Sequence, residues 1–311
     1  MPATVRVAAV QAAPVFLDRD ATIEKAAALT KEAAAEGAGL VVFPEAFVPT
    51  YPDWVWRTKP WADSEWYGRL FDNSVEVPGP AADALGAGAR EAGAWLCVGV
   101  NERDGGTLYN SLLYFSPDGS LAGRHRKLMP TGAERLVWGY GDGSGLLVLD
   151  TPFGRVGGLT CWENYMPLAR AAMYAQGVDI YLAPTWDNSD MWVPTLRHIA
   201  KEGRIHVVGV TFCLRGSDVP RDLPGAAEMY GGDDDWLARG NSVIVGPDGD
   251  LLAGPLEEAE GIVMAELDVE GARRSKRYFD PVGHYARPEV LRLVVDREAK
   301  APVTFPEESV D

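Results

Sequence analysis

The feature of the sequence that most constrains its fold is an apolar run that ends at a cysteine and soon becomes helical. Residues 156–160 (VGGLT) predict a strand, Cys161 follows it, and residues 167–173 predict a helix that begins at Pro167. Proline suits a first helical turn, where its missing N–H has no partner to lose. A strand, a sharp turn and a helix are typical of α/β proteins. Such a turn exposes a nucleophile beside free backbone N–H groups.

Apolar runs and helical patterns alternate along the rest of the chain. The runs at 5–11, 40–43, 95–101, 109–115, 178–184 and 206–213 predict strands, and those at 20–36, 80–92 and 194–203 predict helices. A continuous apolar run such as 40–43 is expected for a strand covered on both faces. No repeat or linker divides the chain, so we expect one α/β domain. Residues 291–295 predict a terminal strand, and 302–311 a tail.

Composition and charge exclude several classes of function. Of 311 residues, 47% are hydrophobic, and no apolar run approaches the ~20 residues of a membrane span. The first residues enter strand-like sequence directly, without a charged start and an apolar middle, so we expect no signal peptide and a cytoplasmic protein. Lys plus Arg is 29 and Asp plus Glu is 45, a net charge of −16. Such a chain repels phosphate backbones, so we expect no nucleic-acid partner.

The cysteines and histidines indicate neither disulfides nor a metal. Three cysteines, at 97, 161 and 213, form no close pair, and four histidines, at 125, 198, 206 and 284, lack metal-ligand spacing. The glycine-rich piece at 141–144 (GDGS) lacks the Lys-Ser/Thr of a phosphate loop. We therefore expect no metal and no nucleotide cofactor.

Cys161 taken alone would more often be a small buried hydrophobic residue than a catalytic one. Two other stretches favour catalysis: Glu45 stands two residues after the run 40–43, and Lys127 precedes a loop. Catalytic groups gather at strand ends of this kind in open α/β sheets. The segments around Glu45, Lys127 and Cys161 resemble, in this chain order, those of the nitrilases of the carbon–nitrogen hydrolase superfamily. The Cys-Trp-Glu-Asn at 161–164 is similar to the nitrilase branch in particular.

The resemblance extends from Val7 to about Glu289 and implies a fold, a reaction and an assembly. The implied fold is a four-layer α-β-β-α sandwich, with one hydrolase domain over 1–290 and a strand and tail over 291–311. The implied reaction is hydrolysis of an organic nitrile to the carboxylic acid and ammonia, without a cofactor. Cys161 would form a thioimidate and then a thioester, Glu45 would act as base, and Lys127 would stabilise negative charge. Glu134 matches a second site glutamate. The family also implies a homo-oligomer, a dimer or larger.

An aromatic stretch between residues 51 and 71 has no helical or strand periodicity and predicts a long irregular segment over the site. Aromatic side chains commonly line ligand pockets. As substrate-binding candidates we name Tyr51, Trp54, Trp138, Trp162 and Trp186. They favour an organic nitrile over bare cyanide, and leave open whether its side chain is aliphatic, aromatic or arylacetonitrile-like.

Three alternatives remain open from the sequence. An amidase or carbamoyl hydrolase would use the same Glu45, Lys127 and Cys161 on a C=O carbon. A Cys/His hydrolase would use one of the four histidines as its base. A non-enzymatic assembly or binding protein would merely pack Cys161 in its core. The helical surfaces at 168–174 and 195–201 are candidates for contacts between copies.

Overall fold

The computed structural model describes residues 4–301 and 303, and it contains two seven-stranded sheets. The strands of the first sheet are β1 (Thr4–Gln11), β2 (Leu40–Val42), β3 (Val75–Glu76), β4 (Trp95–Asp104), β5 (Thr107–Phe115), β6 (Leu121–Arg126) and β14 (Gly261–Asp268). Those of the second are β7 (Leu149–Thr151), β8 (Gly154–Gly158), β9 (Ile180–Thr185), β10 (His206–Thr211), β11 (Cys213–Arg215), β12 (Trp236–Val245) and β13 (Leu251–Glu257). The helices are α1 (Arg19–Ala35), α2 (Ser64–Asp72), α3 (Pro80–Ala92), α4 (Pro167–Ala175), α5 (Trp192–Gly203), α6 (Ala226–Tyr230) and α7 (Val269–Ser275).

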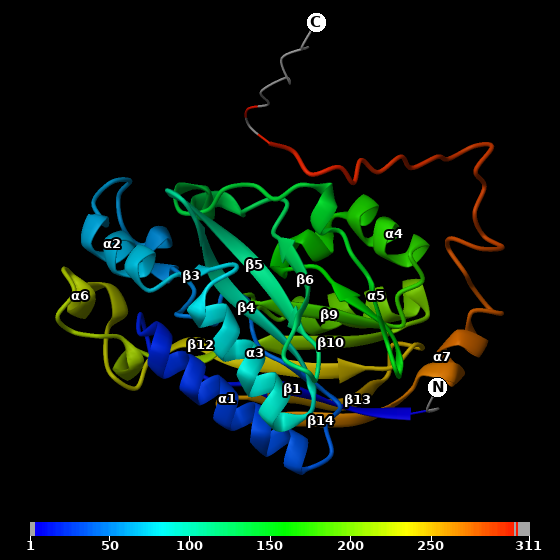
Figure 1. Ribbon diagram of the computed structural model, residues 1–311, viewed down its shortest axis with the longest axis horizontal. Coiled ribbons are helices and arrows are strands. Elements are labelled where there is room, and N and C mark those ends of the chain that lie inside the picture. The colour runs from blue at the N-terminus through cyan, green and yellow to red at the C-terminus, as the bar shows by residue number, and fades with distance from the viewer. Residues whose placement is uncertain (1–3, 302, 304–311) are drawn as a thin grey trace, which may run out of the picture.

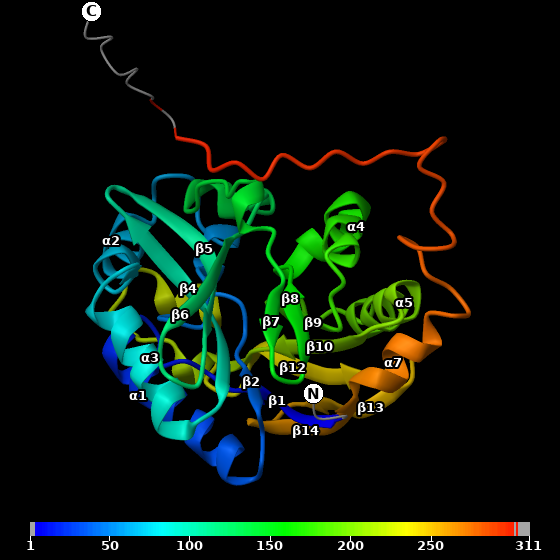
Figure 2. The same ribbon diagram turned by 45° about the vertical axis from the view of Figure 1, so that its right-hand side comes forward.

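The two sheets pack face to face, with α1 and α3 outside the first and α4 and α5 outside the second (Figures 1 and 2). The first sheet has the order β14-β1-β2-β4-β5-β6, with β3 beside β4. The second has the order β11-β12-β10-β9-β8-β7, with β13 beside β12. The predicted single-domain, four-layer α-β-β-α sandwich is therefore confirmed.

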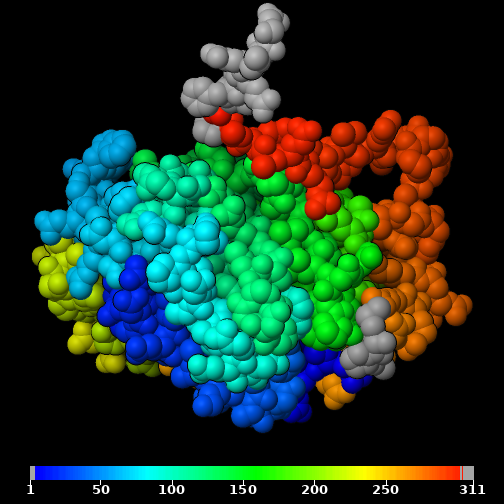
Figure 3. All heavy atoms as spheres, viewed as in Figure 1, coloured from blue at the N-terminus to red at the C-terminus, as the bar shows by residue number. Residues whose placement is uncertain are grey.

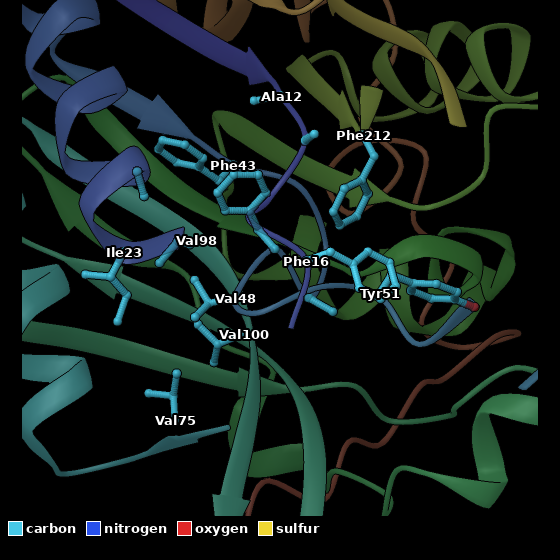
Figure 4. Packing of buried hydrophobic residues seen from close by; sticks show 14 of the residues in the cluster. Ala12, Phe16, Ile23, Phe43, Val48, Tyr51, Val75, Val98, Val100 and Phe212 are labelled. Carbon is cyan, nitrogen blue, oxygen red and sulfur yellow. The ribbon is translucent and has the colours of Figure 1, made fainter. Parts of the chain in front are cut away.

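Successive side chains of a strand face two different cores. Both faces of the strand are therefore apolar, and its sequence is a continuous apolar run. In β9, Ile180 and Leu182 face the core between the sheets, whereas Tyr181 and Ala183 face the core beneath α4 and α5. The same period of two appears in β1, β10 and β12. A third core lies beneath α1 and α3, and Figure 4 shows part of it around Ile23.

The predicted irregular segment is partly helical, and this part of the prediction is wrong. After Pro60 the chain forms α2, whose residues Trp66 and Leu70 are buried four positions apart on one helix face. Trp66 packs against Trp54, with ring centroids 5.3 Å apart. The density of aromatic residues masked this short amphipathic pattern in the sequence.

The predicted terminal strand at 291–295 is also wrong. This segment has no strand pairing, and it crosses the outer surface as the orange and red chain of Figures 1 and 3. Leu291 is 78% exposed and Val294 is 77% exposed, because the segment leaves the sandwich after α7 and adds to neither sheet. Its far end is held where the Lys300 N–H donates to Asp142 Oδ2, at 2.7 Å. Except for Val303, the predicted tail at 302–311 lies outside the described residues.

Each of the three cysteines is free and buried. Burial raises the pKa of Cys213 to about 11, and it raises the pKa of Cys97 further, so both behave as core residues. Among the helices of the described residues, none is both long and apolar enough to cross a membrane.

The side chain of Gln11, at the end of β1, joins the two sheets. It is fully buried, and its Nε2 donates to the carbonyls of Leu256 at 3.0 Å and Ala259 at 2.8 Å. Its Oε1 accepts from the backbone N–H of Ser242 at 3.0 Å. Gln11 therefore links a strand of the first sheet to the buried Ser242 N–H of β12 and to two less buried carbonyls in and just after β13.

We predict that Gln11→Leu lowers the free energy of unfolding by about 2–3 kcal/mol, because it leaves the buried N–H of Ser242 without a partner and removes two further hydrogen bonds to carbonyls. Urea denaturation would measure the loss. Gln176→Leu is a matched control, since that half-buried amide donates to the carbonyls of Leu146 and Ala172, and it should cost only about 1 kcal/mol. A loss at Gln11 no larger than that at Gln176 would contradict the role given to Gln11.

Candidate active site

The predicted catalytic side chains meet at one edge of the sandwich. Glu45 follows β2, Lys127 follows β6, and Cys161 follows β8. β2 pairs in parallel with β4, and the antiparallel pairs β4–β5 and β5–β6 turn β6 back to the same direction. The Sγ of Cys161 and carboxylate oxygens of Glu45 and Glu134 lie within 4.8 Å of one another. The fold therefore brings together residues from three separate stretches of the sequence.

The turn at Cys161 is held in an unusual conformation. Cys161 has a φ of 54°, in the left-handed region that residues other than glycine rarely adopt, and such strain is common at active sites. The residue opens a 3₁₀ turn, Cys161–Tyr165, capped by Thr160 and Glu163. The side-chain amide of Asn164 donates to the carbonyl of Cys161 at 2.8 Å. α4 then begins at Pro167, as the sequence predicts.

Glu45 accepts three hydrogen bonds in a fully buried position. Its Oε1 accepts from Lys127 Nζ and from Asn110 Nδ2, both at 2.7 Å, and its Oε2 accepts from the Trp186 N–H at 2.9 Å. Gly99 of β4 permits this placement, because a Cβ there would lie 2.3 Å from the Pro44 carbonyl oxygen. Asn110 was missed from the sequence, although a buried amide within the apolar strand β5 was a usable signal.

Lys127 lies between two carboxylates. Its Nζ is 2.7 Å from Glu45 Oε1 and 2.8 Å from Glu134 Oε2, and all three side chains are buried. Glu134 Oε2 also accepts from the Thr131 N–H at 2.6 Å, and its Oε1 accepts from the Tyr51 hydroxyl at 2.7 Å. Burial alone would lower the pKa of Lys127, but the adjacent negative charges raise it, so the ammonium stays charged.

Burial raises the pKa of both Glu45 and Cys161. For Glu45, Lys127 opposes this effect and Glu134 adds to it, and the net pKa of the carboxyl is raised. For Cys161, the charges of Glu45 and Glu134 add to burial, and the pKa of the thiol lies well above its ordinary value. One ammonium faces two carboxylates, so the site carries surplus negative charge. The resting thiol therefore keeps its proton, with a carboxylate of raised pKa beside it.

The same donor atoms could in principle hold a metal ion, since Glu45, Glu134 and Cys161 each offer one atom to a common point. Both carboxylates, however, already accept from the Lys127 ammonium. A divalent ion would have to displace a buried cation whose pKa is raised. The arrangement fits an internal ammonium better than a metal.

A cavity of about 500 Å³ opens over Cys161. It is lined by Tyr51, Asp53, Trp56, Thr131, Cys161, Trp162, Trp186, Asp187, Asn188 and Ser189. The rings of Tyr51 and Trp186 stack at 4.6 Å with 6° between their planes. Three of the five aromatic residues named from the sequence, Tyr51, Trp162 and Trp186, thus lie on the cavity wall.

Trp54 and Trp138 do not line this cavity, and their prediction as wall residues is corrected. Trp54 is fully buried in the core beside Phe16. Trp138 lies behind Tyr51 and donates its indole N–H to Asn101 Oδ1 at 2.9 Å. Closeness to Glu45 along the chain says nothing about the direction of a side chain.

Trp56 takes the place expected for Trp54. It is 48% exposed on the cavity wall and donates its indole N–H to the Tyr51 hydroxyl at 3.0 Å. The two tryptophans stand two residues apart in the 3₁₀ turn Asp53–Trp56 and point in different directions.

A buried His125–Glu163 pair, not recognised in the sequence, links the Lys127 and Cys161 segments. His125 Nε2 lies 2.9 Å from Glu163 Oε2, and its Nδ1 lies 2.9 Å from the Gly145 carbonyl. Both ring nitrogens face acceptors, so the ring is an imidazolium. Glu163 Oε1 also accepts from the Leu128 N–H at 2.6 Å. Burial lowers the pKa of His125, but Glu163 outweighs it and the net pKa is raised.

Among the described residues, no histidine lines the cavity over Cys161. His125 is paired with Glu163, the exposed His198 pairs with Glu202, His206 is buried in β10, and His284 is exposed. The alternative of a Cys/His hydrolase therefore lacks a base at the thiol.

Comparison with known proteins agrees with this geometry. The family model described as carbon-nitrogen hydrolase matches residues 6–277. An aliphatic nitrilase from Sinorhizobium fredii (strain HH103) is 49% identical over 304 residues, covering 96% of this chain and 97% of that protein. A bifunctional nitrilase/nitrile hydratase from Nicotiana tabacum is 45% identical over 316 residues, covering 97% of this chain and 89% of that protein.

The fold has solved counterparts. The crystal structure of a carbon-nitrogen hydrolase from Helicobacter pylori G27 matches with a TM-score of 0.73 at 22% identity, covering 92% of this chain and 96% of that chain. At this identity the match supports the fold alone. The family model and the relatives show that the chain belongs to the carbon–nitrogen hydrolase family and, within it, to the nitrilases.

The His125–Glu163 pair predicts a pH dependence of stability. The folded pKa of His125 is raised above the ordinary value of 6.5, so its stabilising contribution is complete below about pH 6.5 and is lost as pH rises through the folded pKa. We expect the free energy of unfolding of the wild type to fall relative to that of His125→Gln between pH 6 and pH 9. His198→Gln, on the exposed face of α5, serves as the control. Parallel curves for the wild type and His125→Gln would refute the charged pair.

Proposed function

We propose that this nitrilase hydrolyses an organic nitrile to the carboxylic acid and ammonia through a covalent intermediate on Cys161. The observation that carries the proposal is the meeting of the Cys161 thiol with the Glu45 and Glu134 carboxylates around the Lys127 ammonium. It supplies a nucleophile, a base and a cation in one buried place. The names of the relatives from Sinorhizobium fredii and Nicotiana tabacum support a nitrile as the substrate.

In the first step the sulfur attacks the nitrile carbon. Glu45 takes the thiol proton as the C–S bond forms, because its raised pKa makes it a stronger base than an ordinary carboxylate. Electrons of the triple bond move to nitrogen, which takes up the proton that Glu45 removed from the thiol, so that a thioimidate forms and Glu45 is a carboxylate again. The Lys127 ammonium and a backbone N–H near Trp162 stabilise the negative charge that develops on nitrogen.

In the second stage water completes the hydrolysis. Glu45 activates a water that adds to the thioimidate carbon, and cleavage of the C–N bond releases ammonia and leaves a thioester. A second water then cleaves the C–S bond, which releases the acid and restores the thiol. Each proton moves between side chains and water, so the chemistry balances without a cofactor.

The remaining residues of the site hold these groups in place. Glu134 positions Lys127 through its 2.8 Å contact, and the Tyr51 hydroxyl fixes the other oxygen of Glu134. The aromatic rings of Tyr51, Trp162 and Trp186 form the apolar wall for the side chain of the nitrile.

We also propose a cytoplasmic homo-oligomer of two or more copies. Three free cysteines are compatible with a reducing compartment. The surface around α4 and α5 exposes Tyr165, Leu168 and Met191, and Leu168 is 67% exposed. Contacts between copies through this surface would remove these apolar side chains from water.

We predict that Cys161→Ala lowers kcat for a nitrile by at least about 10³-fold, since Cys161 is the one thiol among the described residues that line the cavity, and that Glu45→Gln lowers it by at least about 10²-fold. Ammonia and acid should be measured separately, with the amide of the same acid tested in parallel. Cys213→Ala, which removes a buried thiol that does not line the cavity, should keep the wild-type rate. Release of ammonia from the amide but not from the nitrile would instead indicate an amidase, and turnover by Cys161→Ala would exclude the covalent route.

The assembly predicts a measurable mass. Light scattering should give a multiple of the 33.6 kDa chain, and Leu168→Glu should lower that mass, because it places a charge on the apolar surface of α4. Glu24→Lys, a charge change on the exposed face of α1, is the control. A wild-type mass of a single chain would contradict the proposed homo-oligomer.

A further inference from the structure

Asp187 is an acidic group on the cavity wall that the proposed chemistry does not use. It follows Trp186 beyond the end of β9, and its Oδ2 accepts from the indole N–H of Trp162 at 2.9 Å. Its Oδ1 accepts from the Ser189 N–H at 2.8 Å. Both partners are neutral, and the ion pairs formed within residues 4–301 and 303 do not include Asp187. The carboxylate therefore faces the cavity without a cation beside it.

Among the described residues, no Lys, Arg or His lines the cavity, and the cations bonded to its lining or to the catalytic carboxylates have acidic partners. Arg57 forms an ion pair with Asp53, which lines the cavity. Lys127 is bonded to both Glu45 and Glu134. The described lining of the cavity thus offers no cationic side chain to a substrate carboxylate, whereas Asp187 would repel it. The chain's net charge of −16 repels anions as well.

We infer that Asp187 sets the charge class of the substrate: the enzyme accepts neutral and cationic organic nitriles and rejects those that carry a carboxylate near the nitrile. The inference rests on the proposed nitrile hydrolysis. Trp162 follows the nucleophile directly in sequence, and its ring is held by Asp187, so the side chain of a bound nitrile passes close to this carboxylate. Discrimination here acts by repulsion of the wrong substrate rather than by contacts to the right one.

The test compares three nitriles of matched size whose side chains end in a carboxylate, a methyl group or an ammonium. For the wild type, kcat/KM should rise in that order. Asp187→Asn should raise kcat/KM for the anionic nitrile relative to the neutral one by roughly threefold to tenfold, the size expected for removing one charge at close range in a partly solvated site. The gain should lie mainly in KM, because the charge acts on binding and not on the reacting atoms. The asparagine oxygen still accepts from Trp162.

Asp83→Asn is the matched control, since Asp83 is an exposed aspartate on α3 and does not line the cavity. It should leave the ratio of anionic to neutral kcat/KM unchanged. Added salt gives a second measurement that needs no variant, because screening should raise this ratio in the wild type, and by less in Asp187→Asn.

Two outcomes would overturn the inference: wild-type preference for the anionic nitrile, or a ratio that neither Asp187→Asn nor salt alters. Either could occur while the neutral nitrile is hydrolysed, and the proposed function would then stand. If none of the three nitriles gave ammonia or acid, the proposed function itself would fail.

Discussion

The catalytic centre depends on the buried ammonium of Lys127. The Lys127 ammonium has no access to water and is stabilised by the Glu45 and Glu134 carboxylates at 2.7 and 2.8 Å. Charges buried in this way are tolerated only with good geometry and further hydrogen bonds. The Asn110 amide, the Trp186 N–H, the Thr131 N–H and the Tyr51 hydroxyl supply those bonds. The positions of both carboxylates are therefore fixed by the requirement to neutralise one lysine.

This arrangement needs two sheets. Glu45 and Lys127 follow strands of the first sheet, whereas Cys161 and Trp186 follow strands of the second. Only when the sheets pack face to face do their strand ends share one buried edge. Two further interactions hold the sheets and the catalytic segments in place. They are the hydrogen bonds from Gln11 to the second sheet and the His125–Glu163 pair between the Lys127 and Cys161 segments. Both hold together the elements that carry the reacting groups.

Local pattern and family resemblance predict different parts of the molecule. The helix 80–92 and the strands at 5–11 and 40–43 follow from apolar runs and helix formers. The resemblance picked out Glu45, Lys127 and Cys161, which the structure brings together. Two facing sheets could not be predicted from periodicity. A strand covered on both faces has the same continuous apolar sequence whether a helix or another sheet covers it.

The directions of individual side chains and the path of the C-terminal segment could not be predicted from the sequence either, because both depend on distant parts of the chain. Trp54 and Trp56 stand two residues apart, yet one is in the core and the other on the cavity wall. Their environments depend on α2 and Tyr51, which approach from elsewhere. The apolar residues at 291–295 suggest a strand, but a strand needs an available sheet edge, and the route of the chain after α7 takes these residues away from both sheets.

The charge of the catalytic centre and that of the cavity wall are parts of one electrostatic arrangement. Burial, together with the surplus negative charge around Lys127, raises the pKa of the Cys161 thiol, so the thiolate forms only while Glu45 accepts its proton. An unpaired cation on the cavity wall, of the kind needed to bind an anionic nitrile, would stabilise the ionised form of Glu45. The pKa of Glu45 would fall, and Glu45 would be a weaker base. An acidic wall at Asp187 avoids that competition. Because the buried site needs a strong base, it favours substrates without negative charge. The mechanism of attack and the choice of substrate therefore depend on the same electrostatic arrangement.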